Sequence, residues 1–196
     1  MSKESSRRKP SRRAQVRFLE AGLQALADRG HAGLKLATVC EQVGATSGSF
    51  YYAFPSWGDF TTELIRYWRE EMSTRLIVES SAIASAAERL GHLVDIGVRL
   101  PHRSEGAIRV WAAHDAHVAS VVAEVDRERH AAIATAYEAV VPDVASARRY
   151  ATAAMYLLIG HEGSAVGSVE DLRWAFRALL DQALAASAPA DRRDET

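Results

Sequence analysis

The sequence lacks several features that mark whole classes of protein. Cys40 is the only cysteine, which excludes a disulfide-stabilised scaffold. The longest uncharged stretch of interest, residues 150–160, is far shorter than the roughly 20 apolar residues that a membrane span requires. No apolar run follows the basic N-terminus, so we expect no secretory signal. With 48% hydrophobic residues the chain is too apolar for a disordered protein, and a cytoplasmic globular protein is expected.

A surplus of charge of one sign is also missing, since the net charge is only −1. The distribution is nevertheless uneven, because residues 1–13 hold six basic residues against one acidic residue, and the rest of the chain holds 18 against 24. A basic terminal block is usually a solvated tail, and its functional alternative is an arm that contacts nucleic-acid phosphates.

The sequence carries no phosphate-binding or dinucleotide-binding glycine fingerprint. His161-Glu162 begins like a zinc-protease signature, but Ala165 stands where the second histidine is required. The glycines at 163 and 167 have the wrong spacing for a nucleophile elbow. We therefore predict no catalytic residue, no metal and no cofactor.

Apolar residues recur at helical spacing through almost the whole chain, and no segment alternates as a strand would. The pattern predicts an all-α fold of about nine helices, in which Gly30, Gly44 and Pro101 end helices and Ser56, Asp143 and Ser168 begin them.

Residues 36–54 form the most specific pattern. Two short predicted helices flank a tight turn, Val43-Gly44-Ala45-Thr46, as in a helix-turn-helix. The second helix has Phe50 and Phe54 as its apolar edge, and small hydroxyl residues and two tyrosines occupy the rest. Such a helix can approach the major groove of DNA closely and hydrogen-bond to phosphates or base edges.

These motifs together resemble the DNA-binding domain of the TetR family of bacterial transcriptional regulators. The resemblance covers about residues 13–72 and rests on residues 18–22 and 28–30, Val43-Gly44, residues 49–52 and Phe54-Pro55-Ser56. It implies a homodimer that binds double-stranded DNA at a palindromic operator, usually as a repressor controlled by a small-molecule effector. It implies no enzymatic activity and no membrane association.

The resemblance also implies a division of the chain and a set of DNA contacts. The division is a basic flexible arm at 1–12, a helix-turn-helix domain at 13–72, a helical ligand-binding and dimerisation domain at 73–188, and a disordered tail at 189–196. The DNA-binding residues expected are Arg12, Arg13, Lys35, Thr38, Thr46, Ser47, Gly48, Ser49, Tyr51 and Tyr52. Lys35 departs from the usual helix-capping hydroxyl, which suggests a phosphate contact.

The C-terminal part gives weaker predictions. Candidates for a ligand pocket between its helices are Trp111, His114, Tyr137, Tyr156 and His161, with core packing as the alternative for each. A second functional hypothesis is an α-helical hydrolase or metal-binding protein that uses His114 and His117. Its structural alternative is that Asp115 caps the helix beginning at Ala116.

Overall fold

A computed structural model describes residues 11–187. Within that range the chain is helical and contains no strand, which confirms the predicted all-α fold. The helices are α1 (Arg12–Arg29), η1 (His31–Gly33), α2 (Leu36–Val43), α3 (Ser47–Ala53), α4 (Trp57–Arg69), η2 (Glu70–Thr74), α5 (Arg75–Ser81), α6 (Ala86–Arg99), α7 (His102–Ala112), α8 (Ala116–Glu138), α9 (Val144–Gly163) and α10 (Val169–Ser187).

The helix termini have the caps that the sequence indicated. Ser56 Oγ accepts the N–H of Asp59 at 3.0 Å and so caps α4. Asp115 Oδ1 accepts the N–H groups of His117 and Val118 at the start of α8. Each cap satisfies backbone donors that the first helical turn leaves unpaired, so local chemistry fixes where these helices begin.

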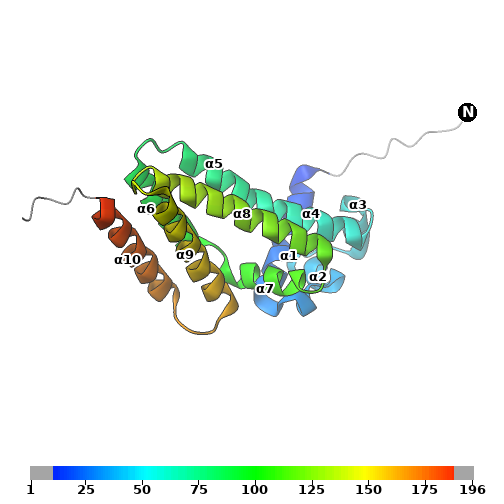
Figure 1. The fold of residues 1–196 in the computed structure, drawn as a ribbon. Helices are drawn as coiled ribbons and strands as arrows, with labels where there is room; N and C mark the ends of the chain where they lie inside the picture. Colours follow the sequence, from blue (N-terminus) through cyan, green and yellow to red (C-terminus); the bar gives the residue numbers. More distant parts are fainter. Residues whose placement is uncertain (1–10, 188–196) are drawn as a thin grey trace, which may run out of the picture.

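The molecule is elongated, with α1 to α4 and α7 at one end and α6, α9 and α10 at the other (Figure 1). The segments α4, η2 and α5 form one continuous helix that packs along α8. Its middle, η2, is a turn of π-helix, and such turns are often found at functional sites. The sequence pattern held no sign of this turn.

The largest core does not stop at the predicted domain boundary near residue 72. Phe18, Phe50 and Phe60 pack in one cluster with Ile108 of α7 and Val118 of α8. Two smaller clusters lie among α6, α8, α9 and α10. The helix-turn-helix end therefore rests directly on α7 and α8, and these helices belong to its core.

Among the helices of residues 11–187, none combines the length and the apolarity that a membrane crossing requires.

Candidate nucleic-acid interface and ligand cavity

The turn between α2 and α3 has the geometry of a helix-turn-helix. Gly44 adopts left-handed backbone angles, φ 67° and ψ 38°, which a residue with a side chain rarely adopts. The N–H of Ala45 donates to Cys40 O at 2.9 Å and closes α2. Thr46 Oγ1 accepts the N–H of Ser49 at 3.2 Å and opens α3. Two short helices are thus joined with no flexible linker between them.

Aromatic packing fixes the orientation of α3. Phe50 and Phe54 are buried, and the ring of Phe50 meets those of Phe18 and Phe60 edge-on, with centroids 5.5 and 5.2 Å apart. Since these side chains hold one face of α3 against α1 and α4, the opposite face must point outward. The exposed residues on and before this helix are Thr46, Ser47, Gly48, Ser49, Tyr51 and Tyr52. The two tyrosine side chains are 50% and 52% exposed.

Gly48 has no structural reason to be glycine. A Cβ added there would meet Thr46 Oγ1 alone, at 3.7 Å, which is ordinary van der Waals contact. A side chain at this position would extend from the exposed face of α3. Because glycine has none, a binding partner can come closer to the helix backbone there.

Several basic side chains of the helix-turn-helix end are exposed. Arg13 and Lys35 are exposed, and Lys35 precedes α2 without a side-chain hydrogen bond to cap it. Arg12 pairs with Glu63 at 3.0 Å, although it stays more than half exposed. Sequence reasoning missed Arg17, which lines a groove together with Thr46, Gly48, Ser49 and Tyr52. Arg17 follows Arg13 by one helical turn, which was the signal available in the sequence.

Thr38 lies apart from this surface. It is buried, and its Oγ1 accepts a hydrogen bond from Arg29 Nη1 at 3.5 Å. It belongs with Val39 and Cys40 to the side of α2 that faces the core. The structure therefore does not place Thr38 where DNA could reach it, and we leave it out of the interface.

The residues predicted for a ligand pocket do not converge. Trp111 is buried and its ring stacks on His31, with centroids 5.1 Å apart, because α7 packs on the helix-turn-helix end. Tyr137 is buried against Tyr150 at 5.5 Å, and burial raises its pKa to about 12. Both side chains fill the core, which is the alternative that the sequence left open.

The other three candidates are equally scattered. His114 is exposed after α7, and Tyr156 on α9 is 72% exposed. The ring of His161 meets that of His102 edge-on at 4.6 Å. The predicted pocket is therefore not formed by these five residues.

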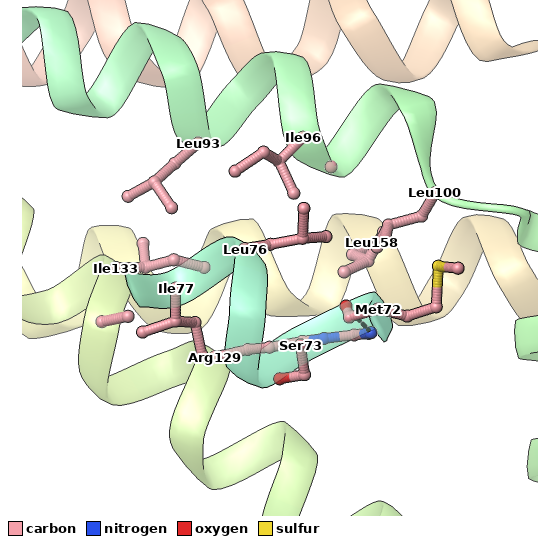
Figure 2. A pocket seen from close by; sticks show the side chains of 12 residues that line it. Met72, Ser73, Leu76, Ile77, Leu93, Ile96, Leu100, Arg129, Ile133 and Leu158 are labelled. Atoms are coloured by element: carbon pink, nitrogen blue, oxygen red, sulfur yellow. Dashed lines mark hydrogen bonds between the residues drawn. The ribbon is translucent and has the colours of Figure 1, made fainter. Parts of the chain in front are cut away.

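The structure instead has an apolar cavity between η2, α5, α6, α8 and α9 (Figure 2). Its lining residues are Met72, Ser73, Leu76, Ile77, Leu93, Ile96, Gly97, Leu100, Arg129, Ala132, Ile133 and Leu158. None of them was predicted, because aliphatic residues at helical spacing look the same whether they fill a core or line a cavity.

A buried ion pair lies at one end of this cavity. Arg129 Nη1 donates to Glu105 Oε2 at 3.0 Å, and Arg129 Nη2 donates to Met72 O in η2 at 2.8 Å. Trp68 Nε1, near the end of α4, donates to Glu105 Oε1 at 2.7 Å. One carboxylate on α7 thus holds together the last turn of α4 and the middle of α8.

A second group of charges, which is only partly buried, links α7, α8 and α9. Arg109 donates two hydrogen bonds to Asp126, each 2.9 Å long, and a third to Glu162 Oε2 at 2.7 Å. The approach is close because a Cβ at Gly106 would lie 2.4 Å from Glu162 O. Burial, with Glu105 nearby, raises the pKa of Glu162 to about 7, and Arg109 opposes this.

The histidine hypothesis finds no converging ligands. His114 and His117 are exposed, and Asp115 between them caps α8. Across residues 11–187, no three His, Cys, Asp or Glu side chains are grouped so that they could hold a metal ion. Nothing in this region favours a catalytic or metal site.

No family model and no curated protein matches the sequence, but solved structures match its fold. A TetR-family transcriptional regulator from Rhodococcus sp. superposes with a TM-score of 0.70 at 19% identity, over 88% of this chain and 99% of the other. A transcriptional regulator from Saccharomonospora viridis in complex with choline gives 0.69 at 20% identity, over 87% and 97%.

A third match is the transcriptional regulator FadR from Bacillus subtilis in complex with stearoyl-CoA. Its TM-score is 0.61 at 14% identity, over 87% of this chain and 98% of the other. These likenesses extend over nearly the full length of the known structures, far beyond the helix-turn-helix. The chain therefore has the fold of the TetR-family transcriptional regulators.

Proposed function

We propose that this protein is a TetR-family transcriptional regulator that binds double-stranded operator DNA and responds to a small molecule. The observation that carries the proposal is the face of α3. Phe50 and Phe54 hold the helix to the core, and the residues of the helix that carry hydroxyl and phenol groups are all exposed. A helix that served only the core would not need an exposed face of this composition, whereas such a face can enter the major groove of DNA.

The exposed residues divide by their chemistry into two kinds of contact. The exposed basic residues Arg13, Arg17 and Lys35 are proposed to supply positive charge for phosphates, and the exposed Tyr51 a phenol for the same purpose. Thr46, Ser47, Ser49 and Tyr52 lie toward the groove and meet base edges. Gly48 lets the duplex approach the helix backbone. The basic residues before Ser11 lie outside the described residues, and we propose that they add phosphate contacts.

The protein is proposed to act as a homodimer. Tyr156 on α9 and Trp174 on α10 are 72% and 73% exposed, which is unusual for large aromatic side chains. Two helices from each subunit can bury these rings in a four-helix arrangement. A two-fold dimer presents two copies of α3 and therefore requires a roughly palindromic operator.

The cavity beside η2 is the proposed effector site. The structures from Saccharomonospora viridis and Bacillus subtilis hold choline and stearoyl-CoA, so this fold accommodates ligands of unlike chemistry. In this chain the cavity borders the continuous helix α4–η2–α5, and Phe60 of α4 packs on Phe50 of α3. A ligand that shifts this helix changes the placement of α3. A hundredfold loss of operator occupancy requires only about 2.7 kcal/mol.

The protein is proposed to be a repressor that acts in the bacterial cytoplasm at the nucleoid, and no enzymatic activity is proposed. Binding to DNA from its own upstream region, followed by fluorescence anisotropy, tests the proposal. Tyr51→Ala should abolish operator binding and Ser47→Ala should weaken it, since both remove a group that touches DNA. Ser81→Ala, an exposed serine at the end of α5, is the matched control and should bind as the wild type does.

Two results would contradict this assignment of residues. Unchanged operator binding by Tyr51→Ala in a folded protein would show that α3 does not face DNA in the proposed way. Deleting residues 2–10 should reduce the slope of log affinity against log salt by about 0.9 for each phosphate that the segment neutralises. An unchanged slope would remove the N-terminal segment from the interface.

A further inference from the structure

The exposed face of α3 has no side chain that pairs with a base through two hydrogen bonds. From Thr46 to Ala53 the sequence contains no arginine, lysine, asparagine or glutamine. These four residue types distinguish guanine or adenine in the major groove by bidentate hydrogen bonds. A serine hydroxyl both donates and accepts, so a single one bonds to either kind of group on a base edge. Base recognition by α3 therefore requires a different feature of the bases.

The hydroxyl group of Thr46 is already used within the turn. Thr46 Oγ1 accepts the N–H of Ser49 and also hydrogen-bonds with Ser49 Oγ, each at 3.2 Å. Thr46 is nevertheless an exposed residue. The Cβ of a threonine carries its hydroxyl and its methyl group on separate branches. Because the hydroxyl is held against α3, the methyl group Cγ2 is the part of the side chain that can meet a partner.

Thr46 lies in a surface groove between α1 and α3, which we call the α1–α3 groove. Its other lining residues include Ala45, Tyr52 and Arg17. Of the described residues that line it, Arg17 is the only charged one and none is acidic. Arg17 Nη2 donates to Val43 O at 3.0 Å, which holds the guanidinium at this groove. A mostly apolar groove with one fixed cation is suited to a polyanion that offers an apolar group.

Thymine is the base of DNA that offers such a group in the major groove. Its 5-methyl group projects there, whereas adenine, guanine and cytosine present hydrogen-bond donors and acceptors. The methyl groups of alanine and threonine are suitable partners for it. Ala45 is half-buried and Tyr52 is half exposed, so both can be touched from outside along with Thr46.

We propose that α3 selects thymine through its 5-methyl group, which enters the α1–α3 groove and contacts Thr46 Cγ2, Ala45 Cβ and the ring of Tyr52. Each operator half-site then carries a thymine at the base pair that meets Thr46. The inference rests on the proposed function, to which it adds the base that this face selects. Arg17 lies in the same groove, so the methyl contact is accompanied by a contact with phosphate.

Uracil substitution tests the proposal, because uracil differs from thymine only in lacking the methyl group. Selection from a library of random DNA duplexes with the full chain gives a bound sequence. The thymines of that sequence are then replaced by uracil one at a time, and affinity is measured by fluorescence anisotropy. We expect a sensitive thymine in each half-site, at which uracil weakens binding about fourfold. Uracil outside the two half-sites is the DNA control and should leave the affinity unchanged.

Thr46→Ser removes the protein's methyl group and keeps the hydroxyl that caps α3. This variant should bind the thymine duplex about fourfold more weakly for each half-site. Uracil at the sensitive positions should then cause no further loss, because the partner methyl group is already absent. Thr135→Ser is the matched control, since Thr135 is an exposed threonine on α8, outside the groove lining. It should keep the full preference for thymine over uracil.

Three outcomes would overturn the proposal. They are a selected sequence without thymine in its half-sites, unchanged affinity for uracil at every position, and a full preference for thymine in Thr46→Ser. The selection itself separates this inference from the proposed function. A protein that binds a selected duplex but is indifferent to uracil contradicts only the thymine contact. A protein that selects no duplex at all contradicts the proposed function, and the thymine contact with it.

Discussion

The two ends of the molecule are held together by different forces. At the helix-turn-helix end, aromatic rings such as Phe18, Phe50 and Phe60 pack edge-on. Around the cavity, the helices are tied by buried charges, and the two charged residues that are buried in the described chain, Glu105 and Arg129, both lie there. Apolar packing has no preferred partner, whereas an ion pair has one correct geometry. The helix-turn-helix end is therefore held mainly by apolar packing, and the cavity end also by contacts between specific charged partners.

Trp68, near the end of α4, takes part both in the apolar packing and in the buried ion pair. Its ring is buried in the same core as Phe50, and its Nε1 donates to Glu105 Oε1 at 2.7 Å. Arg129 lies over the ring, with its Cζ 5.8 Å from the ring centroid. A change in the ion pair of Glu105 with Arg129 therefore acts directly on α4, the helix that packs on α3.

The largest expected effect comes from breaking the ion pair on one side only. Glu105→Ala leaves the guanidinium of Arg129 buried without its carboxylate and removes the acceptor of Trp68. Because an unpaired buried charge is costly, we expect the free energy of unfolding to fall by about 3–5 kcal/mol. Urea denaturation followed by circular dichroism measures this.

The matched control removes both charges. Glu105→Leu combined with Arg129→Met keeps the volume and leaves no unpaired charge, so most of the stability should return. If the double variant is as unstable as Glu105→Ala, packing rather than charge stabilises the cavity end. The two ends would then be stabilised in the same way.

A smaller effect is expected from Glu162, the carboxyl group on α9 whose pKa is raised to about 7 from 4.5 by burial. The folded protein keeps a proton that the unfolded chain releases near pH 4.5. The stability that this group contributes is therefore complete below about pH 4.5 and is lost as the pH rises through 7, by about 3 kcal/mol in all.

Glu162→Gln should remove this dependence, because the amide does not ionise. The measurement is the difference in unfolding free energy between the wild type and the variant, from urea denaturation at pH 4 and pH 8. A difference that stays constant across this range would show that the pKa of Glu162 is the same in the folded and the unfolded chain, and would contradict the raised pKa.

The smallest effect is expected at the helix-turn-helix end, where Ser56 caps α4. Ser56→Ala removes one acceptor for the N–H of Asp59, and we expect a loss of about 1 kcal/mol that varies little between pH 6 and pH 8. Thermal unfolding measures this. A strong pH dependence would mean that the stability of the helix-turn-helix end also depends on ionisable groups.

Local features of the structure could be predicted because their causes are local. Gly44 follows the last residue of a short apolar stripe, and it has the left-handed conformation that such a position favours. Ser56 and Asp115 precede apolar runs, and both cap helices. The exposed side of α3 followed from the spacing of Phe50 and Phe54.

Other features could not be predicted, because they depend on which helices meet. Trp111 and Tyr137 looked like pocket residues, but α7 packs on η1 and α8 on α9, so both rings are buried in the interior. Thr38 was expected at the DNA interface but is buried, and Arg17 was not considered but is exposed, since the mutual packing of α1 and α2 sets the rotation of each helix about its axis. The cavity is lined by aliphatic residues that no local pattern distinguishes from core.

The sequence by itself determined that the chain is all-helical, where its helices begin and end within a few residues, and which helix carries a hydroxyl-rich outer face. These properties follow from capping and from apolar spacing along a single helix. The tertiary structure alone decided the cavity, the π turn beside it and the ion pair of Glu105 with Arg129, 24 residues apart. The reason is physical: a cavity or a buried charge pair exists only where separate helices pack, and the sequence of one helix does not specify its neighbours.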